Sequence, residues 1–247
     1  MVINMAESKH DTEAVASAAT NRFELTGGAL CLDFANTVDN RPTAATDALR
    51  TYADLVDWAE QAQVIPRQVG ESLRAEAIRR PAAAEAALAG ARALREGLHA
   101  IFSAVAAHRE VPAESQALLN AALAPSLARL QLTAPAGASG PAVAADDGSR
   151  FTWRWDFDDR ALDGVLAPVV ESAADLLTSP DLARVRECEA DSCAWLFIDR
   201  SRNRSRRWCD MAVCGNRAKA RRYQARTRKV VFPSPGAEAG GDRSSSG

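Results

Sequence analysis

Four cysteines near the C-terminal end constrain this chain more than any other feature of its sequence. Four residues separate Cys188 from Cys193, four separate Cys209 from Cys214, and fifteen separate the two pairs. Two matched short spacings around a longer insert favour a tetrahedral four-thiolate zinc site, because each pair places two ligands on one side of the ion. We therefore predict one structural zinc ion, which would add on the order of 10 kcal/mol of folding free energy to a segment with few apolar residues.

The alternatives for the cysteine cluster are four buried thiols, two disulfides, an iron–sulfur cluster or a catalytic zinc. Disulfides are disfavoured because residues 1–23 lack the continuous apolar stretch of a secretory signal, and we expect a cytoplasmic protein. Nothing suggests redox chemistry or a ligand position open to water, which disfavours the last two. No run of about 18 uncharged apolar residues occurs, so we also expect no membrane-spanning helix.

The residues around the cysteines predict the shape of the zinc module. We expect the fifteen-residue insert to fold out as a hairpin, with the polar turn RSRNRS at its tip and Trp195 and Phe197 on one face. Residues 215–229 contain no proline and many helix formers, which predicts a helix that starts near Cys214 and points its positive N-terminal end at the thiolates. Knuckle, hairpin, knuckle and helix in this order resemble a treble-clef finger.

Charge is distributed very unevenly along the chain. The formal net charge of the whole chain is −2, but residues 184–229 carry 14 Lys and Arg against 5 Asp and Glu, whereas residues 1–183 are net −10. Such asymmetry favours a polyanionic partner. Twelve of the 14 basic residues are arginines, which favours forked contacts with phosphates or guanine edges. The candidate nucleic-acid contacts in this segment are Arg200, Arg202, Arg204, Arg206, Arg207, Arg217, Lys219, Arg221, Arg222 and Arg228.

Double-stranded DNA is the partner that this segment favours, because phosphates would relieve the repulsion among like charges on one helix. Three alternatives stay open. In the first, the basic segment docks on the acidic body as an autoinhibitory contact, which can coexist with DNA binding. In the second, it binds RNA, with Trp195, Trp208 and Tyr223 stacked on unpaired bases. In the third, it is an adaptor that meets an acidic protein of the transcription machinery.

Upstream of the cysteines, hydrophobic periodicity predicts a mostly helical body and an α+β fold. Phe151, Trp153 and Trp155 alternate with polar residues, which predicts a half-buried strand paired with the stretch 127–133 in a small antiparallel sheet. Apolar residues at helical spacing predict helices over 47–64, 69–78, 82–107, 112–124 and 159–177. We divide the chain into a flexible leader (1–20), this body (21–180), the zinc finger (181–229) and a disordered tail (230–247).

Short polar side chains follow an apolar run in the body and are candidates for a ligand pocket that would take a small-molecule effector. They are Asp33, Asn36, Asp39, Asn40 and Arg41. Caps and turn formers are the alternative interpretation, because such residues often have that role between an apolar segment and a helix. Cys31 lies between two leucines and is expected in the core. No nucleophile–base motif or phosphate-binding glycine loop is recognisable, so we expect no enzymatic function.

Two segments of the chain resemble known families. Residues 214–217 read Cys-Gly-Asn-Arg after a matched cysteine pair and resemble the CGNR zinc finger, and residues 28–38 (GALCLDFANTV) resemble the opening of the ABATE domain. Together the likeness covers about residues 22–229. It implies that the four cysteines bind the metal, that Asn216 satisfies a free amide or contacts a base, and that Arg217 reaches a phosphate. It also implies a bacterial, stress-induced transcription regulator with two domains.

Overall fold

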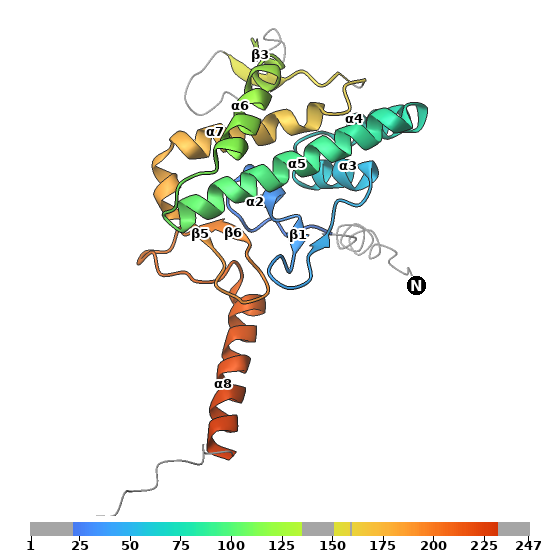
Figure 1. Cartoon of the computed structure of the whole chain (residues 1–247). Helices are drawn as coiled ribbons and strands as arrows, with labels where there is room; N and C mark the ends of the chain where they lie inside the picture. The colour runs from blue at the N-terminus through green and yellow to red at the C-terminus, as the bar shows by residue number, and fades with distance from the viewer. Residues whose placement is uncertain (1–21, 135–150, 159, 232–247) are drawn as a thin grey trace, which may run out of the picture.

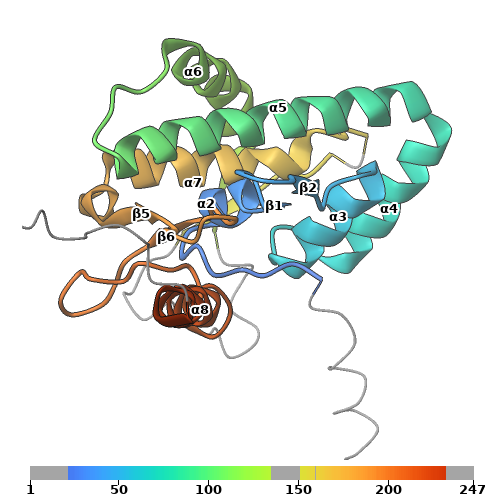
Figure 2. The ribbon, with the colours of Figure 1, turned by 60° about the horizontal axis from the view of Figure 1, so that its bottom comes forward.

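The computed structural model describes residues 22–134, 151–158 and 160–231 and consists of a mostly helical body with a small module at one end, from which a single helix projects (Figure 1). Helix α5 contacts α2, α3, α4 and α6, and α7 packs against α2 and α6 (Figure 2). The helices are α2 (Leu30–Ala35), α3 (Tyr52–Gln61), α4 (Arg67–Arg79), α5 (Pro81–Ala106), α6 (Ala113–Leu127), α7 (Ala167–Thr178) and α8 (Asn216–Val231). This arrangement confirms the predicted α+β fold with a mostly helical body.

The strands form three separate two-stranded antiparallel sheets. They are β1 (Val38–Asp39) with β2 (Thr46–Asp47), β3 (Leu130–Thr133) with β4 (Thr152–Trp155), and β5 (Val185–Glu187) with β6 (Leu196–Ile198). Three short helical turns complete the described structure: η1 (Gly164–Leu166), η2 (Pro180–Arg184) and η3 (Met211–Gly215). The sequence predicts only the second of these sheets in the body.

The central position of α5 follows from its residue pattern. Proline lies in its first turn, where the missing N–H costs no hydrogen bond. Leu88, Leu98, Ile101 and Phe102 recur at helical spacing and are all buried in the core. Burying an apolar side chain of this size contributes about 1.5–3 kcal/mol, so this stripe holds the helix in the middle of the body.

Two predicted helices begin later than their periodicity suggests. The predicted helix 47–64 starts at Tyr52, because Thr51 and Asp54 form a capping box in which each side chain binds the backbone N–H of the other residue. Asp47 instead lies in β2 and accepts two hydrogen bonds from the Arg95 guanidinium, at 2.7 and 2.8 Å. The predicted helix 159–177 becomes helical only at Gly164, and residue 159 lies outside the described residues.

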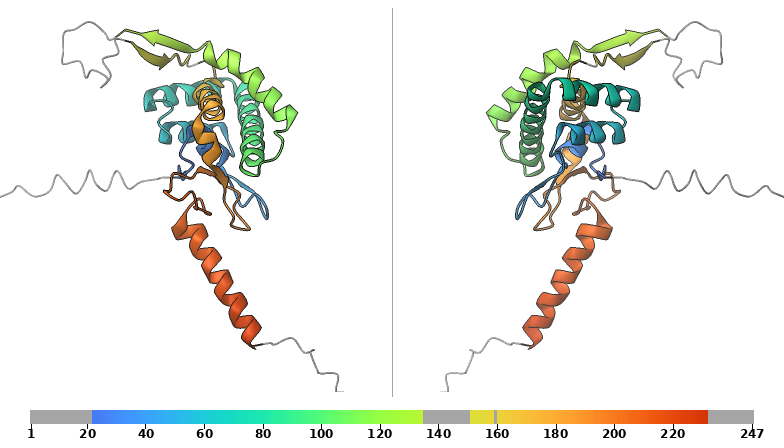
Figure 3. Two further views of the ribbon diagram at one scale, coloured as in Figure 1. Left: turned by 90° about the vertical axis from the view of Figure 1, so that its left-hand side faces the viewer. Right: turned by 90° about the vertical axis from the view of Figure 1, so that its right-hand side faces the viewer.

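The β3–β4 hairpin has the predicted pairing, but the predicted half-burial of its aromatic strand is wrong. Leu132 pairs with Trp153 on one face, and these side chains are 54% and 68% exposed. The hairpin extends past the end of α6, beyond the helices (Figure 3). Its apolar face therefore meets solvent rather than the core in the part of the chain that the structure describes.

The predicted hairpin inside the cysteine insert is also wrong. Strands β5 and β6 flank the first cysteine pair, and the insert continues after β6 as a loop. The fully buried Asp199 explains this loop, because its carboxylate accepts backbone N–H bonds from Ser201 at 2.8 Å and from Arg206 at 2.9 Å. A side chain that bridges both arms of the loop replaces the strand-to-strand hydrogen bonds of a hairpin.

Strands β5 and β6 join the cysteine module to the core of the body, whereas the four cysteines pack with Trp195 and Phe197 in a second, smaller cluster. Val185, Leu196 and Ile198 from β5 and β6 are buried together with Leu32 and Phe34 of α2. Helix α8 follows the second cysteine pair and projects away from the body (Figures 1 and 3). The leader lies outside the described residues, as does all of the predicted tail except residues 230 and 231, which end α8. None of the helices in the described part of the chain combines the length and apolar character that crossing a bilayer requires.

Candidate metal centre and nucleic-acid interface

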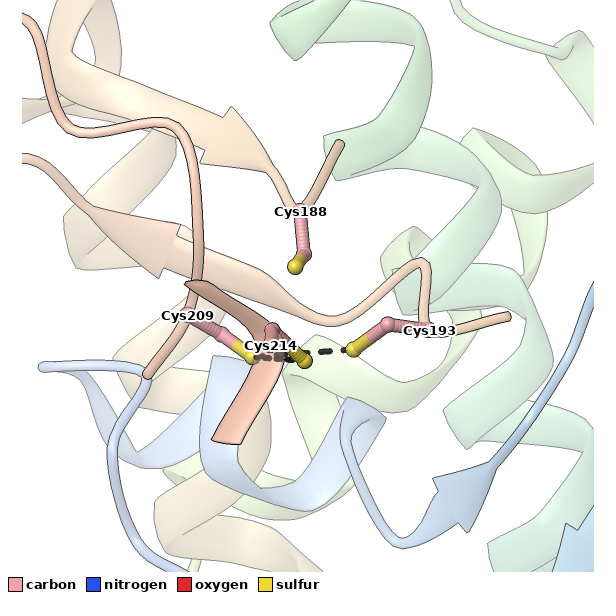
Figure 4. Close-up of side chains that lie close together, drawn as sticks. All are labelled: Cys188, Cys193, Cys209 and Cys214. Atoms are coloured by element: carbon pink, nitrogen blue, oxygen red, sulfur yellow. Dashed lines mark hydrogen bonds between the residues drawn. The ribbon is translucent and has the colours of Figure 1, made fainter. Parts of the chain in front are cut away.

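The four clustered cysteines converge on one point in the structure (Figure 4). Their sulfur atoms lie within 4.8 Å of one another, and all four residues are buried. The Sγ atom of Cys209 lies 3.6 Å from that of Cys193 and 3.7 Å from that of Cys214. Sulfurs bound tetrahedrally at about 2.3 Å from zinc are about 3.8 Å apart, whereas a disulfide holds them at about 2.05 Å. The spacing fits a four-coordinate zinc ion and not two disulfides.

The close approach of the four sulfurs also affects their ionisation. Hydrogen bonds from Cys193 and Cys209 lower the pKa of Cys188 to about 2. The pKa of Cys209 shifts the other way: its hydrogen bonds with Cys188 and Cys193 raise it, and so does burial. Without metal, one thiolate forms only while its neighbours keep their protons. A divalent ion at the centre would allow all four sulfurs to ionise and bind it.

The first cysteine pair is shaped by the loop between β5 and β6. The backbone N–H of Cys188 donates to the Trp195 carbonyl at 2.8 Å, and that of Cys193 donates to the Ala190 carbonyl at 2.9 Å. Ala194 has a φ of 59°, in the left-handed region, which turns the chain sharply after Cys193. This loop brings two sulfurs to the same side of the site before β6 begins.

The second pair is shaped by the turn that leads into α8. The Asp210 carboxylate caps this turn by accepting the Val213 N–H at 2.7 Å. Cys214 lies in η3, directly before α8. A Cβ on Gly215 would lie 2.5 Å from the Met211 sulfur, so glycine gives that side chain room. Cys214 therefore lies just before the N-terminal end of α8, which confirms the predicted helix start near this cysteine.

Hydrogen bonds between the body and the cysteine module support the metal centre. The indole Nε1 of Trp195 donates to the Val38 carbonyl at 3.0 Å, and Ile198 N–H donates to the Gly27 carbonyl at 2.8 Å. On α5, the Nε2 atom of His99 lies 3.0 Å from the Ala194 carbonyl oxygen, and burial lowers the pKa of this imidazole. The Ser103 hydroxyl on the same helix donates to Glu187 at 2.5 Å.

Sequence reasoning missed these supporting residues. His99 lies on α5, a helix that is predicted from its apolar residues alone. No feature of the neighbouring sequence indicates that His99 contacts Ala194. The only available signal is that a polar side chain on the core-facing side of a helix needs a hydrogen-bond partner. Which partner it finds depends on residues about 90 positions away.

Most of the candidate ligand-pocket residues line one cavity, but Arg41 does not. A cavity of about 260 Å³ between the body and the finger is lined by four of the candidates, Asp33, Asn36, Asp39 and Asn40, and by Cys193, Cys209, Cys214 and Arg217. Arg41 does not line it, because its guanidinium pairs with Glu96 at 2.5 Å and donates to the Ala35 carbonyl at 3.0 Å.

The side chains around this cavity also act as structural contacts. Asp33 accepts the Gly27 N–H at 2.7 Å, and burial raises its pKa to about 6. Asn40 has a left-handed φ of 53°, and its carbonyl accepts the N–H groups of Thr43 and Ala44. Cap and turn roles are therefore present, and the binding of an effector here stays a prediction. Cys31 is fully buried in the core as predicted, and burial raises its pKa to about 12.

The candidate nucleic-acid contacts divide into three groups, and the first has structural partners. Arg206 stacks on the Phe197 ring at 4.5 Å and donates to the Trp208 carbonyl at 2.9 Å. It also donates to the Cys209 carbonyl. These contacts brace the insert against the metal centre. Asn216 likewise donates locally, to the Ala212 carbonyl at 2.9 Å.

The second group forms exposed ion pairs. Arg207 pairs with Glu189 at 2.6 Å and Arg221 pairs with Asp191 at 2.7 Å, both within the finger itself. Arg200 reaches Asp181 at 3.6 Å. Exposed pairs of this kind contribute about 0–1 kcal/mol, so a phosphate group can displace the carboxylate at little cost.

The third group is exposed and forms no hydrogen bond or ion pair with any residue that the structure describes. Its members are Arg202, Arg204, Arg217 and Lys219. Arg217 nevertheless lies close enough to the carboxylate of Asp39 for its charge to oppose the rise that burial causes in the pKa of Asp39. The insert and the start of α8 that carry them lie at the end of the molecule opposite the β3–β4 hairpin (Figures 1 and 3). Arg222 and Arg228 also belong to α8, but their side chains are outside the described part of the structure.

Comparisons with known proteins agree with this geometry. The sequence profile of ABATE, described as "Putative stress-induced transcription regulator", matches residues 28–180. The profile of the CGNR zinc finger matches residues 184–227. No curated protein gives a significant match. The two resemblances seen in the sequence are thus confirmed, and with four converging sulfurs so is the prediction of one structural zinc ion.

Proposed function

The chain belongs to the ABATE family and carries a CGNR zinc finger, and on this premise we propose that it is a DNA-binding transcription regulator. In this proposal it acts in the bacterial cytoplasm during stress, is not an enzyme, and binds duplex DNA through the zinc finger while the body modulates that binding. One observation carries the proposal: four basic side chains of the insert and the start of α8 are exposed, namely Arg202, Arg204, Arg217 and Lys219.

Zinc, when bound, supplies a structural cross-link rather than a reactive group. Cys209 ends the insert and Cys214 precedes α8, so a single ion would tie both basic segments to the β5–β6 loop. Contacts with α2 and α5 fix that loop on the body. Basic groups held in this way lose less conformational entropy when they meet a phosphate backbone than groups on flexible arms do.

Burial of the aromatic residues favours duplex DNA over unpaired RNA. Trp195 is only 8% exposed and its indole is bonded to Val38. Trp208 is half-buried against the cysteine cluster. Of the three aromatic residues considered for base stacking, only Tyr223 is largely exposed. Helix α8 has 16 residues and is about 24 Å long, and a helix fits the major groove of B-DNA.

The position of α8 favours an external partner over docking on the acidic body. The helix projects away from the body (Figure 3), and the acidic partners of Arg207 and Arg221 belong to the finger itself. Contacts of the basic side chains with other parts of the chain are few: Arg200 pairs with Asp181 and donates to the Gly28 carbonyl, and Arg217 lies near Asp39. The basic surface is therefore available to bind a polyanion.

Selection from a random pool of duplex DNA and RNA fragments tests this proposal. The zinc-loaded full chain should enrich duplex DNA, and Cys209→Ser, which removes one ligand, should enrich nothing. Enrichment of RNA alone would favour the RNA-binding alternative. Failure to enrich any nucleic acid would contradict the proposal and favour an acidic protein partner.

A further inference from the structure

A larger cavity lies in the body, away from the metal centre. It is bounded by α5, α6 and the segment that runs through η1 into α7, and its volume is about 650 Å³. Pockets that bind small molecules commonly have volumes of about 300–1,000 Å³. Its walls are mostly apolar and include Gly90, Leu94, Leu118, Ala122, Leu166 and Val170.

Arginines line one part of this cavity. Arg80, Arg129 and Arg160 take part in the lining together with a single carboxylate, that of Asp163. Arg80 donates to the backbone carbonyl of Arg160 at 3.3 Å, which places these two residues side by side. Positive groups therefore outnumber negative ones here, although residues 1–183 as a whole are net −10.

Arg129 is held in place by its surroundings. Its guanidinium pairs with Asp163 at 3.1 Å, and its side chain is only 25% exposed. A Cβ on Gly164 would lie 3.0 Å from the guanidinium, so glycine leaves space for it. The arginine is thus oriented beside the apolar walls before any ligand arrives.

We propose that this cavity binds an amphipathic organic carboxylate, such as a fatty acid, with its apolar chain among the alanine and leucine side chains and its carboxylate against Arg129 and Arg160. Apolar surface removed from water contributes about 25 cal/mol per Å². Arginine binds a carboxylate through two parallel hydrogen bonds. Arg129 and Arg80 already pair with Asp163 and Glu76, whereas Arg160 has no acidic partner among the described residues. A cation would be repelled by these arginines, and a neutral alcohol would leave Arg160 without a counter-charge.

The position of the cavity relates it to the zinc finger. Gly90 and Leu94 line it on α5, and His99 and Ser103 further along the same helix contact Ala194 and Glu187 in the finger. A bound carboxylate would therefore contact the same helix that supports the metal centre. The binding site itself does not depend on the proposed DNA binding, and it is tested separately.

Isothermal titration of the zinc-loaded full chain with dodecanoate tests this site. We expect saturable binding of one molecule per chain, and at least tenfold weaker binding of dodecanol and dodecyltrimethylammonium. Equal affinity for the three compounds would overturn the proposal, because the arginines would then recognise nothing. Absence of saturable binding would also overturn it.

Matched variants locate the binding. Gly90→Leu places apolar atoms in the cavity; a Cβ on Gly90 meets no atom within 4 Å, and leucine is a better helix former than glycine. Its control is Ala89→Leu, at the neighbouring exposed position outside the cavity.

A second pair of variants tests the charge. Arg160→Gln removes a positive charge from the cavity, and Arg50→Gln, at an exposed site elsewhere, is its control. Gly90→Leu and Arg160→Gln should weaken dodecanoate binding at least tenfold and the controls not at all; unchanged affinity in Gly90→Leu would overturn the site.

Discussion

The side-chain amide of Asn36 makes both of its hydrogen bonds with the backbone of Leu196, 160 residues further along the chain. The Nδ2 atom donates to the Leu196 carbonyl at 2.8 Å, and the Oδ1 atom accepts the Leu196 N–H at 2.8 Å. All of these groups are buried. Asn36 thus acts like an extra strand residue for β6 and joins α2 to the cysteine module.

Replacing Asn36 by alanine should destabilise the whole chain. Two buried backbone groups would lose their partners, and each unsatisfied group costs about 1–3 kcal/mol. We expect the free energy of unfolding in urea to fall by about 2–4 kcal/mol. Asn120→Ala, at an exposed site on α6, should change it by less than about 0.5 kcal/mol. An unchanged stability in Asn36→Ala would mean that this clamp contributes nothing in solution.

Replacing Cys209 by serine should abolish stoichiometric zinc binding. Because β5 and β6 are packed in the core of the body, we expect the insert and the start of α8 to lose protection from hydrogen exchange while α5 keeps it. Cys31→Ala is the matched control, since Cys31 is buried far from the cluster in sequence and its raised pKa keeps its thiol protonated. Zinc content that is equal in both variants would argue against the four-cysteine site.

The carboxyl group of Asp33 should make stability depend on pH. Burial raises its pKa from 3.8 to about 6, so the folded state binds its proton more tightly than the unfolded state does. The stabilisation is present below pH 3.8 and is lost as the pH rises through 6. Asp33→Asn keeps an oxygen for the Gly27 N–H and removes the charge. We expect it to be more stable than the parent chain by about 1–3 kcal/mol above pH 6.

Urea unfolding of both chains between pH 4 and pH 7.5 measures this difference. The advantage of Asp33→Asn should shrink as the pH falls from 6 to 4, where the parent chain protonates Asp33 in the folded state. An advantage that stays constant over this range would show that the carboxyl group is not the cause.

The two free arginines of the insert should set the affinity for duplex DNA. Arg202→Gln combined with Arg204→Gln should weaken binding about tenfold or more and make the slope of log K against log salt less negative by about 2. Zinc content should stay unchanged, because neither side chain touches the cysteines. Arg50→Gln combined with Arg154→Gln removes the same charge from exposed sites on the body. Equal losses in both double variants would indicate that net charge alone governs binding.

Local spacing in the sequence was enough to predict the longer helices and the metal ligands, but not α2 or the starts of α3 and α7. The stripe on α5 and the paired cysteines each depend on residues a few positions apart. The partners of Asn36, His99 and Asp199 could not be predicted, because a polar side chain shows that it needs a partner and not which one it finds. Trp153 was misjudged for a related reason: alternation shows which side chains share a face, but a covering element must exist before that face is buried.

The salt dependence of duplex binding by the zinc-loaded full chain tests the central claim most directly. Fluorescence anisotropy with a labelled random-sequence duplex gives the affinity at each salt concentration. If about five phosphates are contacted, the slope of log K against log salt should be about −4 to −5. A slope near zero, or no binding at low salt, would contradict the proposal that the basic zinc finger binds the phosphates of duplex DNA.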